Sequence, residues 1–199
     1  MKTFLSESVD FVVMSDNIHV LAVSKTGDNG YPIDQVVEVA VFKVDLSANM
    51  MESVYDKVVK QDTSVWSDEV KDRVKDLYGI SPEDVEEGCN EDAVAQDLRE
   101  LLQDKTITAF DVKGDFMGHL KNEPYALARK VEVSSAISSR SSFVYRLPSK
   151  QTPGPEGLRM SYKAILPDDP AGIGESAGAY EDAARASAIL LELHQRGLY

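Results

Sequence analysis

Two apolar, β-branched runs joined by a turn-rich linker place the strongest constraint on the fold of this chain. The first run, residues 19–23 (HVLAV), breaks abruptly into Ser24-Lys25-Thr26-Gly27. The second run, residues 35–45 (QVVEVAVFKVD), partly alternates apolar and polar side chains, as a half-buried strand does. The intervening KTGDNGYPID contains glycine, proline and asparagine, which favour turns. The pattern predicts an antiparallel hairpin at the start of the domain.

Helical patterns dominate after a third strand that we expect from Val54. Residues 64–79 have a serine cap candidate, early acids and a closing Gly79, and Ser81-Pro82 is typical of a second helix start. Further helices are expected over 91–104, over 117–130 with an interruption near Pro124, and over 177–197. Residues 106–116 return to a strand and then turn through Gly114. This order predicts an α/β fold, a mixed sheet with helices on both faces.

The bulk composition is that of one globular domain. The chain has 199 residues, 43% of them hydrophobic, and Cys89 is its only cysteine, which fits a reducing compartment. No apolar run approaches the roughly 18 to 20 residues of a membrane span, and the start does not resemble a signal peptide. We expect a cytoplasmic protein without a membrane partner, with an N-terminal extension (residues 1–17) and a single domain (residues 18–199).

The charge is strongly negative but unevenly distributed. The net charge of −13 argues against indiscriminate binding to polyanions. Residues 129–163 nevertheless carry seven basic and two acidic side chains, a net +5, which leaves −18 for the rest. This segment is either a solvated loop face or a surface for nucleic acid.

Few motifs carry recognisable chemistry. The three histidines, His19, His119 and His194, show no metal-ligand spacing, and no glycine-rich phosphate loop is present. Among many carboxylates, Asp115 follows a predicted strand and turn, and Asp182 lies early in the last predicted helix. Acids at such places can converge on a divalent metal ion, and each alone is also compatible with a surface or helix-start charge.

Five segments in order resemble the DnaQ-like 3′–5′ exonucleases, which have a ribonuclease-H-like fold. VLAVSKTG is similar to the first motif, Val-Leu-Asp-x-Glu-Thr-Thr-Gly, and QVVEVAVFKVD to the strand after it. DLYGISPEDV resembles the family's His-Gly-Ile-Thr segment, with Tyr78 in place of the histidine. TITAFDVKGDFMGHL resembles Val-Ala-His-Asn-x-x-Phe-Asp, and AGAYEDAARASAILLEL resembles His-Arg-Ala-x-x-Asp-Ala. The resemblance covers about residues 20–194.

The resemblance implies a degenerate site. Members of this DEDD family use four carboxylates to hold two metal ions, and its His-containing branch adds a histidine as general base. The first-motif acids fall on Ala22 and Ser24, and the histidine falls on Ala177. Only Asp115 and Asp182 are retained as catalytic and metal-binding candidates. No obligatory cofactor is then expected, and at most one weakly bound Mg²⁺ or Mn²⁺.

Two functional hypotheses follow from the resemblance. In the first, which we favour, the chain has lost catalysis and is a scaffold for single-stranded nucleic acid or its 3′ end, for another protein or for a second copy. Arg140, Arg146 and Lys150 are then the expected nucleic-acid contacts. In the second, it is an active metal-dependent 3′–5′ exonuclease on single-stranded DNA or RNA, with substitute ligands from Asp111, Glu175 or Glu181. A function unrelated to the fold is a further alternative.

Overall fold

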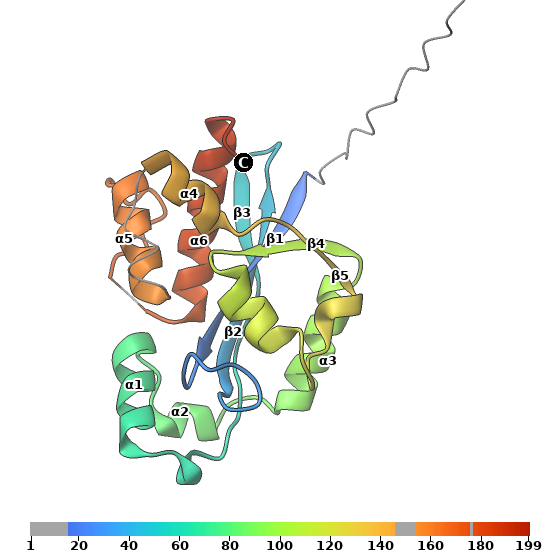
Figure 1. Ribbon diagram of the computed structural model, residues 1–199, viewed down its shortest axis with the longest axis vertical. Helices are drawn as coiled ribbons and strands as arrows, with labels where there is room; N and C mark the ends of the chain where they lie inside the picture. The colour runs from blue at the N-terminus through green and yellow to red at the C-terminus, as the bar shows by residue number, and fades with distance from the viewer. Residues whose placement is uncertain (1–15, 146–153, 176) are drawn as a thin grey trace, which may run out of the picture.

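A five-stranded mixed sheet forms the centre of the molecule. The computed structural model describes residues 16–145, 154–175 and 177–199. The strands have the spatial order β3-β2-β1-β4-β5 (Figure 1). Their bounds are β1 (Asn17–Lys25), β2 (Val36–Asp45), β3 (Met50–Val58), β4 (Lys105–Ala109) and β5 (Val131–Val133).

The first three strands pair antiparallel and the last two pair parallel. β1 pairs with β2 as the predicted hairpin, and β2 pairs with β3 in the same manner. β4 adds to the other side of β1 in the parallel sense, and β5 adds in parallel to β4. The predicted mixed α/β sheet is therefore confirmed.

Helices cover both faces of this sheet. The longer helices are α1 (Asp68–Tyr78), α2 (Pro82–Glu86), α3 (Glu91–Leu102), η2 (Lys113–Leu120, of π type), α4 (Ile137–Tyr145), α5 (Pro155–Ile165) and α6 (Ala179–Gln195). Two single 3₁₀ turns are η1 (Thr63–Val65) and η3 (Leu127–Arg129). α4, α5 and α6 lie on one face, α3 lies on the other, and α1 and α2 lie at one end (Figure 1). None of the helices described here has the length and apolar character of a membrane span.

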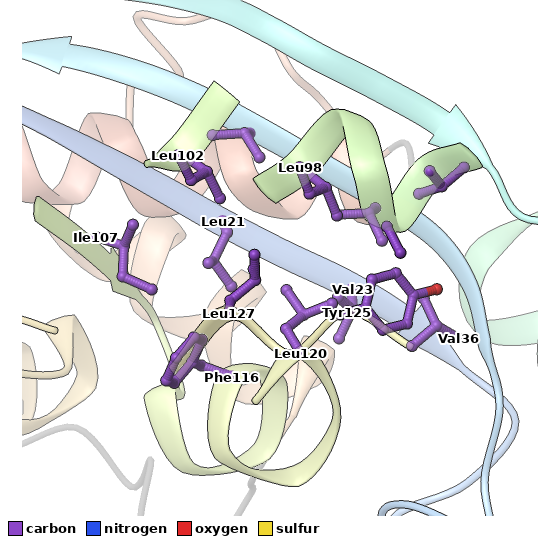
Figure 2. Packing of buried hydrophobic residues seen from close by; sticks show 14 of the residues in the cluster. Leu21, Val23, Val36, Leu98, Leu102, Ile107, Phe116, Leu120, Tyr125 and Leu127 are labelled. Carbon is purple, nitrogen blue, oxygen red and sulfur yellow. The ribbon is translucent and has the colours of Figure 1, made fainter. Parts of the chain in front are cut away.

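Alternation along β1 divides the interior into two main cores. Leu21 and Val23 point to the α3 side, where they pack with buried side chains of α3, β4 and η2 (Figure 2). Ile18 and Val20 belong to the opposite core, with the apolar stripe of α6. The five stripe residues predicted for this helix are all buried: Ala183, Ala186, Ile189, Leu190 and Leu193. Because successive side chains of a strand point to opposite faces, β1 contributes buried residues to the cores on both sides of the sheet.

Local capping fixes the α1–α2 segment as the sequence predicts. The Ser67 hydroxyl accepts a hydrogen bond from the Val70 N–H, and Gly79 ends α1 in a left-handed conformation at φ 72°. Ser81 and Asp84 form a reciprocal capping box at the start of α2. These caps set the orientation of Tyr78, the last residue of α1.

A β-bulge interrupts the β1–β2 ladder at the end that the linker over residues 26–35 joins. Ser24 pairs with Glu38, but Lys25 pairs with Val36, so Val37 on β2 has no opposite residue. The Val37 side chain is fully buried in a separate, smaller cluster with Trp66 and Tyr78. The bulge therefore attaches the α1–α2 segment to the sheet.

Three sequence expectations need correction. Gly114 does not lie in a turn after a strand, because η2 begins at Lys113 and includes both Gly114 and Asp115. The helix expected over 117–130 ends at Leu120, and only the 3₁₀ turn η3 follows Pro124. β3 begins at Met50 rather than Val54, because it continues the tight β2–β3 hairpin. β1 begins at Asn17, and residues 1–15 lie outside the described part of the chain.

Candidate functional site

A small pocket lies where the C-terminal end of β1 meets η2, α1, α5 and α6. Its wall includes both acids singled out by the sequence, Asp115 and Asp182, together with Ala22, Lys25 and Tyr78. The free volume is about 30 Å³. One water molecule needs roughly 10 to 15 Å³ of such space, so the pocket in this conformation holds water rather than a nucleotide.

Asp115 is paired with a lysine of its own chain. The Lys25 Nζ atom lies 3.8 Å from Asp115 Oδ1, and only 9% of the lysine side chain and 16% of the aspartate side chain are exposed. A Cβ atom at position 114 would stand 3.2 Å from this Nζ and 2.7 Å from Asp111 Oδ2, so Gly114 permits their close approach. Burial raises the pKa of Asp115 to about 7, although the positive charge of Lys25 opposes the rise.

Asp182 is paired with an arginine on the same helix. Arg185 Nη1 donates to Asp182 Oδ1 at 3.0 Å, and Arg185 Nη2 donates to the Gly174 carbonyl oxygen at 3.1 Å. The arginine side chain is 1% exposed. Burial raises the pKa of Asp182 to about 6, against the lowering effect of Arg185 and then Arg159. Both retained acids thus have side-chain cations beside them.

Ala22 and Ser24, which the resemblance aligns with the acids of the first motif, take part in packing and in a helix cap. Ala22 lies in an apolar cluster with Ala179 and Ala183 at the start of α6. The fully buried Ser24 hydroxyl donates to Glu38 Oε2 at 2.8 Å, and the same carboxylate oxygen accepts the Ala179 N–H. Glu38 therefore caps α6 from the neighbouring strand.

The buried position of Glu38 shifts the pKa of its carboxyl group. Burial raises the pKa of Glu38 to about 7, while the hydrogen bonds from Ala179 and Ser24 favour the ionised form and reduce the rise. The carboxylates of Asp56 and Glu181 add smaller repulsive contributions. Glu38 is consequently a buried group that titrates near neutrality.

Two of the three candidate substitute ligands, Asp111 and Glu175, already have partners within the chain. Asp111 Oδ1 accepts the N–H groups of Lys113 and Gly114 at the start of η2. Glu175 forms a 2.7 Å ion pair with Lys163 on the surface. Glu181 lies beside Gly178, where an added Cβ would come within 2.9 Å of Glu181 Oε2. Within the described ranges, no three His, Cys, Asp or Glu side chains are grouped closely enough to hold a metal ion.

The remaining predicted residues lie outside this cluster. Ala177 lies two residues before the start of α6 and is half-buried. Arg140 is exposed on α4, on the same side of the sheet as α5 and α6 (Figure 1). Arg146 and Lys150 fall outside the described residues.

Sequence reasoning missed the three residues that complete the cluster. Arg185 had a usable signal, because residues three apart on a helix are neighbours and Asp182 was already singled out. Glu38 and Lys25 had no such signal in the sequence. Strand register brings Glu38 to Ser24, and packing between distant segments brings Lys25 to Asp115.

Comparison with known proteins identifies the fold. No family model matches the chain, and no curated protein matches it. Among solved structures, a 3′-exonuclease described for 3′-end-specific recognition of a histone mRNA stem-loop is similar, with a TM-score of 0.65 and 15% identity over 92% of this chain and 83% of that one.

Two further structures agree with this comparison. The nuclease domain of 3′hExo, a DEDDh family member bound to rAMP, has a TM-score of 0.64 and 15% identity over 94% of this chain and 95% of that one. E. coli exonuclease I in complex with a dA16 oligonucleotide has a TM-score of 0.65 and 15% identity over 90% of this chain and 41% of that one. At this identity the likeness concerns the architecture, and the chain has the α/β, ribonuclease-H-like fold of these 3′-exonucleases.

Proposed function

We propose that this protein has the exonuclease fold without the exonuclease reaction, and that it acts as a metal-independent binding scaffold for single-stranded nucleic acid. The observation that carries the proposal is the pairing of both retained acids with cations of the chain itself, Asp115 with Lys25 and Asp182 with Arg185. Two-metal hydrolysis requires the opposite, a group of uncompensated carboxylates that binds cations from solution.

Electrostatics disfavours a divalent ion at Asp115. Two like unit charges 4 Å apart repel by about 4 kcal/mol at an effective dielectric constant of about 20, and a doubly charged ion doubles this figure. A metal ion at Asp115 would experience such repulsion from the Lys25 ammonium. With alanine at 22 and serine at 24, no first-motif carboxylate offsets it.

Support for a nucleic-acid ligand comes from the similar structures and from charge. The similar proteins include one described with an mRNA stem-loop and one with dA16. The basic segment, residues 129–163, includes Arg140, which is exposed on α4. It also includes Arg159, whose positive charge lowers the pKa of Asp182 at the pocket. Arg140, Arg146 and Lys150 are the proposed phosphate contacts. A protein partner or a second copy is the scaffold's alternative ligand.

The first test is cleavage of a 5′-labelled single-stranded oligonucleotide by the purified full-length protein in Mg²⁺ or Mn²⁺. The matched control is the Asp115→Asn/Asp182→Asn variant. We expect no 3′ shortening above the control at high protein concentration. A ladder of products that only the unmutated protein forms would establish the alternative, an exonuclease with rearranged ligands.

The second test is fluorescence anisotropy with the same oligonucleotide at low salt. We expect equal affinity in EDTA and in Mg²⁺, and weaker binding when Arg140, Arg146 and Lys150 are all changed to glutamine. A smaller dependence of affinity on salt should accompany that loss, because fewer counterions are released. Unchanged affinity of the triple variant would refute the proposed contacts, and no binding at all would direct the search to a protein partner.

A further inference from the structure

A groove of about 290 Å³ lies where β3, α6 and the loop after α5 meet. It shares no lining residue with the candidate site. Most of its lining is apolar and consists of Met51, Leu166, Pro170, Ala171, Ala188 and Leu191. A cavity of roughly 150 Å³ accepts a benzene ring, so this groove has room for an aromatic ring and an aliphatic side chain.

The polar residues of the groove already have partners. Gln195 Nε2 donates to Asn49 Oδ1 at 2.6 Å, and Arg196 Nε donates to Glu192 Oε1 at 2.7 Å. An apolar occupant can therefore enter without taking a hydrogen bond from these groups.

Three apolar side chains of the groove remain incompletely covered. Met51, Leu166 and Leu191 are half-buried and pack against the core that contains the apolar stripe of α6. An occupant that covers them removes apolar surface from water, which is favourable. The groove thus suits hydrocarbon or aromatic side chains.

The chain itself contains a segment of this chemistry. Residues 11–14 (FVVM) are an uninterrupted apolar run just before β1, and they lie outside the described part of the chain. A run of four apolar residues is unfavourable on a surface exposed to water unless it packs against something. The run also carries no charge, so burying it in an apolar groove costs no charge desolvation.

The start of β1 brings this segment to the groove. The Leu46 N–H donates to the Asp16 carbonyl oxygen at 2.7 Å, so the chain enters β1 beside the β2–β3 turn. Asn49 lies in that turn, lines the groove and is bonded to Gln195 near the end of α6. The turn and the end of α6 lie at the same end of the molecule (Figure 1).

The connecting chain is long enough. Asn49 is three residues beyond Leu46, so their Cα atoms are at most about 11 Å apart. An extended chain advances about 3.3 Å per residue, and residues 11–14 can therefore lie about 7 to 17 Å from Asp16. We propose that residues 11–14 dock into this groove of their own chain, with the Phe11 ring beside Met51. The docked segment joins β3, α6 and the loop after α5.

The first test is NMR of the full-length protein with ¹³C-labelled methionine methyl groups. Phe11→Ser removes the aromatic ring from the groove, and we expect the Met51 methyl signal to shift by more than its line width. Phe4→Ser is the matched control, because it makes the same change in the same extension outside the apolar run. A Met51 signal that Phe11→Ser leaves in place, or that both variants shift equally, would overturn the proposal.

The second test is crosslinking with a short bismaleimide, in a Cys89→Ser background that removes the exposed native thiol. Val13→Cys with Ala171→Cys should give a link within one molecule, because Ala171 is exposed and lines the groove. Val13→Cys with Ser64→Cys, whose serine is exposed on η1, should give none. A link only between two molecules would assign the groove to a second copy, and this result or the absence of any link would refute docking within the chain.

A change in the groove wall completes the test. Leu191→Glu should lower the yield of the Val13→Cys/Ala171→Cys link roughly tenfold, because it places a carboxylate where apolar side chains are buried. Phe11→Ser should lower the yield similarly, and it leaves every described residue unchanged, so a loss cannot come from misfolding of the groove. An undiminished yield in both variants would contradict the proposal.

Discussion

The buried guanidinium of Arg185 lies 3.0 Å from the Asp182 carboxylate, three residues earlier on α6, and also donates to the Gly174 carbonyl oxygen. One side chain therefore pairs with the Asp182 carboxylate and also holds the backbone at Gly174, before the helix. The same contacts that balance the charge of Asp182 contribute to the stability of the fold.

Arg185→Leu should destabilise the protein by about 3 to 5 kcal/mol, because it leaves the Asp182 carboxylate buried without its cation. Chemical denaturation at pH 8 measures this loss. Arg196→Leu, in an exposed pair with Glu192, is the matched control and should cost about 0.5 kcal/mol or less. Adding Asp182→Asn to Arg185→Leu should recover part of the loss, and a double variant no more stable than the single one would argue against the pairing.

Stability should fall as pH rises from about 4.5 to 7, with Glu38 as a main cause. Its pKa is about 7 in the folded protein against 4.5 for an ordinary glutamate, so the folded state holds this proton more tightly. The corresponding stabilisation, about 3 kcal/mol, is fully present below the lower value and is lost as pH passes the higher one.

Glu38→Gln keeps acceptors for Ser24 and Ala179 and cannot ionise. Its unfolding free energy should therefore vary less between pH 4.5 and 7.5 than that of the unmutated protein, as denaturant melts at several pH values would show. Asp45→Asn, at an exposed turn, should not flatten the curve. Parallel pH profiles for Glu38→Gln and the unmutated protein would exclude Glu38 as the titrating group.

Lys25→Met should raise the pKa of Asp115 further above its value of about 7, because the charge of Lys25 is the main influence that lowers it. A ¹³C NMR titration of the aspartate carboxyls measures the change. Lys43→Met removes an exposed lysine paired with Glu52 and should leave Asp115 unaffected. An Asp115 pKa that does not move would show that the 3.8 Å contact is not maintained in solution.

Installing the first motif of the DnaQ-like exonucleases should create a metal site. The triple variant Ala22→Asp/Ser24→Glu/Lys25→Thr supplies two carboxylates and removes the competing ammonium. Without metal it should be less stable than the unmutated protein, since position 22 packs among alanines of α6.

Mn²⁺ should stabilise this variant by about 2.7 kcal/mol at roughly 100 times its Kd. Differential scanning calorimetry with and without the ion records the shift in Tm, and the unmutated protein should show none. If Mn²⁺ does not change the Tm of the triple variant, then positions 22 and 24 do not face Asp115 and Asp182 as the resemblance implies.

Gly79→Ala should destabilise α1 by about 1 kcal/mol, although no atom lies within 4 Å of the added Cβ. The cost comes from the backbone, because φ is +72° at this residue. Gly79→Asn is the control, since asparagine tolerates the left-handed region better and should cost less. Equal thermal stability of both variants would contradict this explanation.

Much of the fold could be predicted because its signals are local. The β1–β2 hairpin follows from alternation and a turn-rich linker, and the ends of α1 follow from Ser67 and Gly79. Gly114 misled the prediction because glycine usually marks a turn, whereas here it makes room for Lys25 and Asp111 inside a helix. Only the tertiary contact distinguishes these uses of glycine.

The site was less accessible to sequence reasoning. The resemblance located Asp115 and Asp182, but their state depends on partners that packing selects. Lys25 meets Asp115 from another segment, and Glu38 meets Ser24 through strand register. The pKa values of these acids therefore depend on contacts between residues far apart in the chain, and the neighbouring residues in the sequence do not reveal those contacts.

The bulge at Val37 has a mechanical consequence. Val37 is the residue that the β1–β2 ladder leaves unpaired, and its side chain packs with Tyr78, which lines the candidate site. Any occupant that displaces Tyr78 therefore strains the sheet at the one place in this ladder where pairing is already interrupted. Because no residue of β1 stands opposite Val37, movement of Val37 would leave the pairing of Ser24 with Glu38 and of Lys25 with Val36 in register.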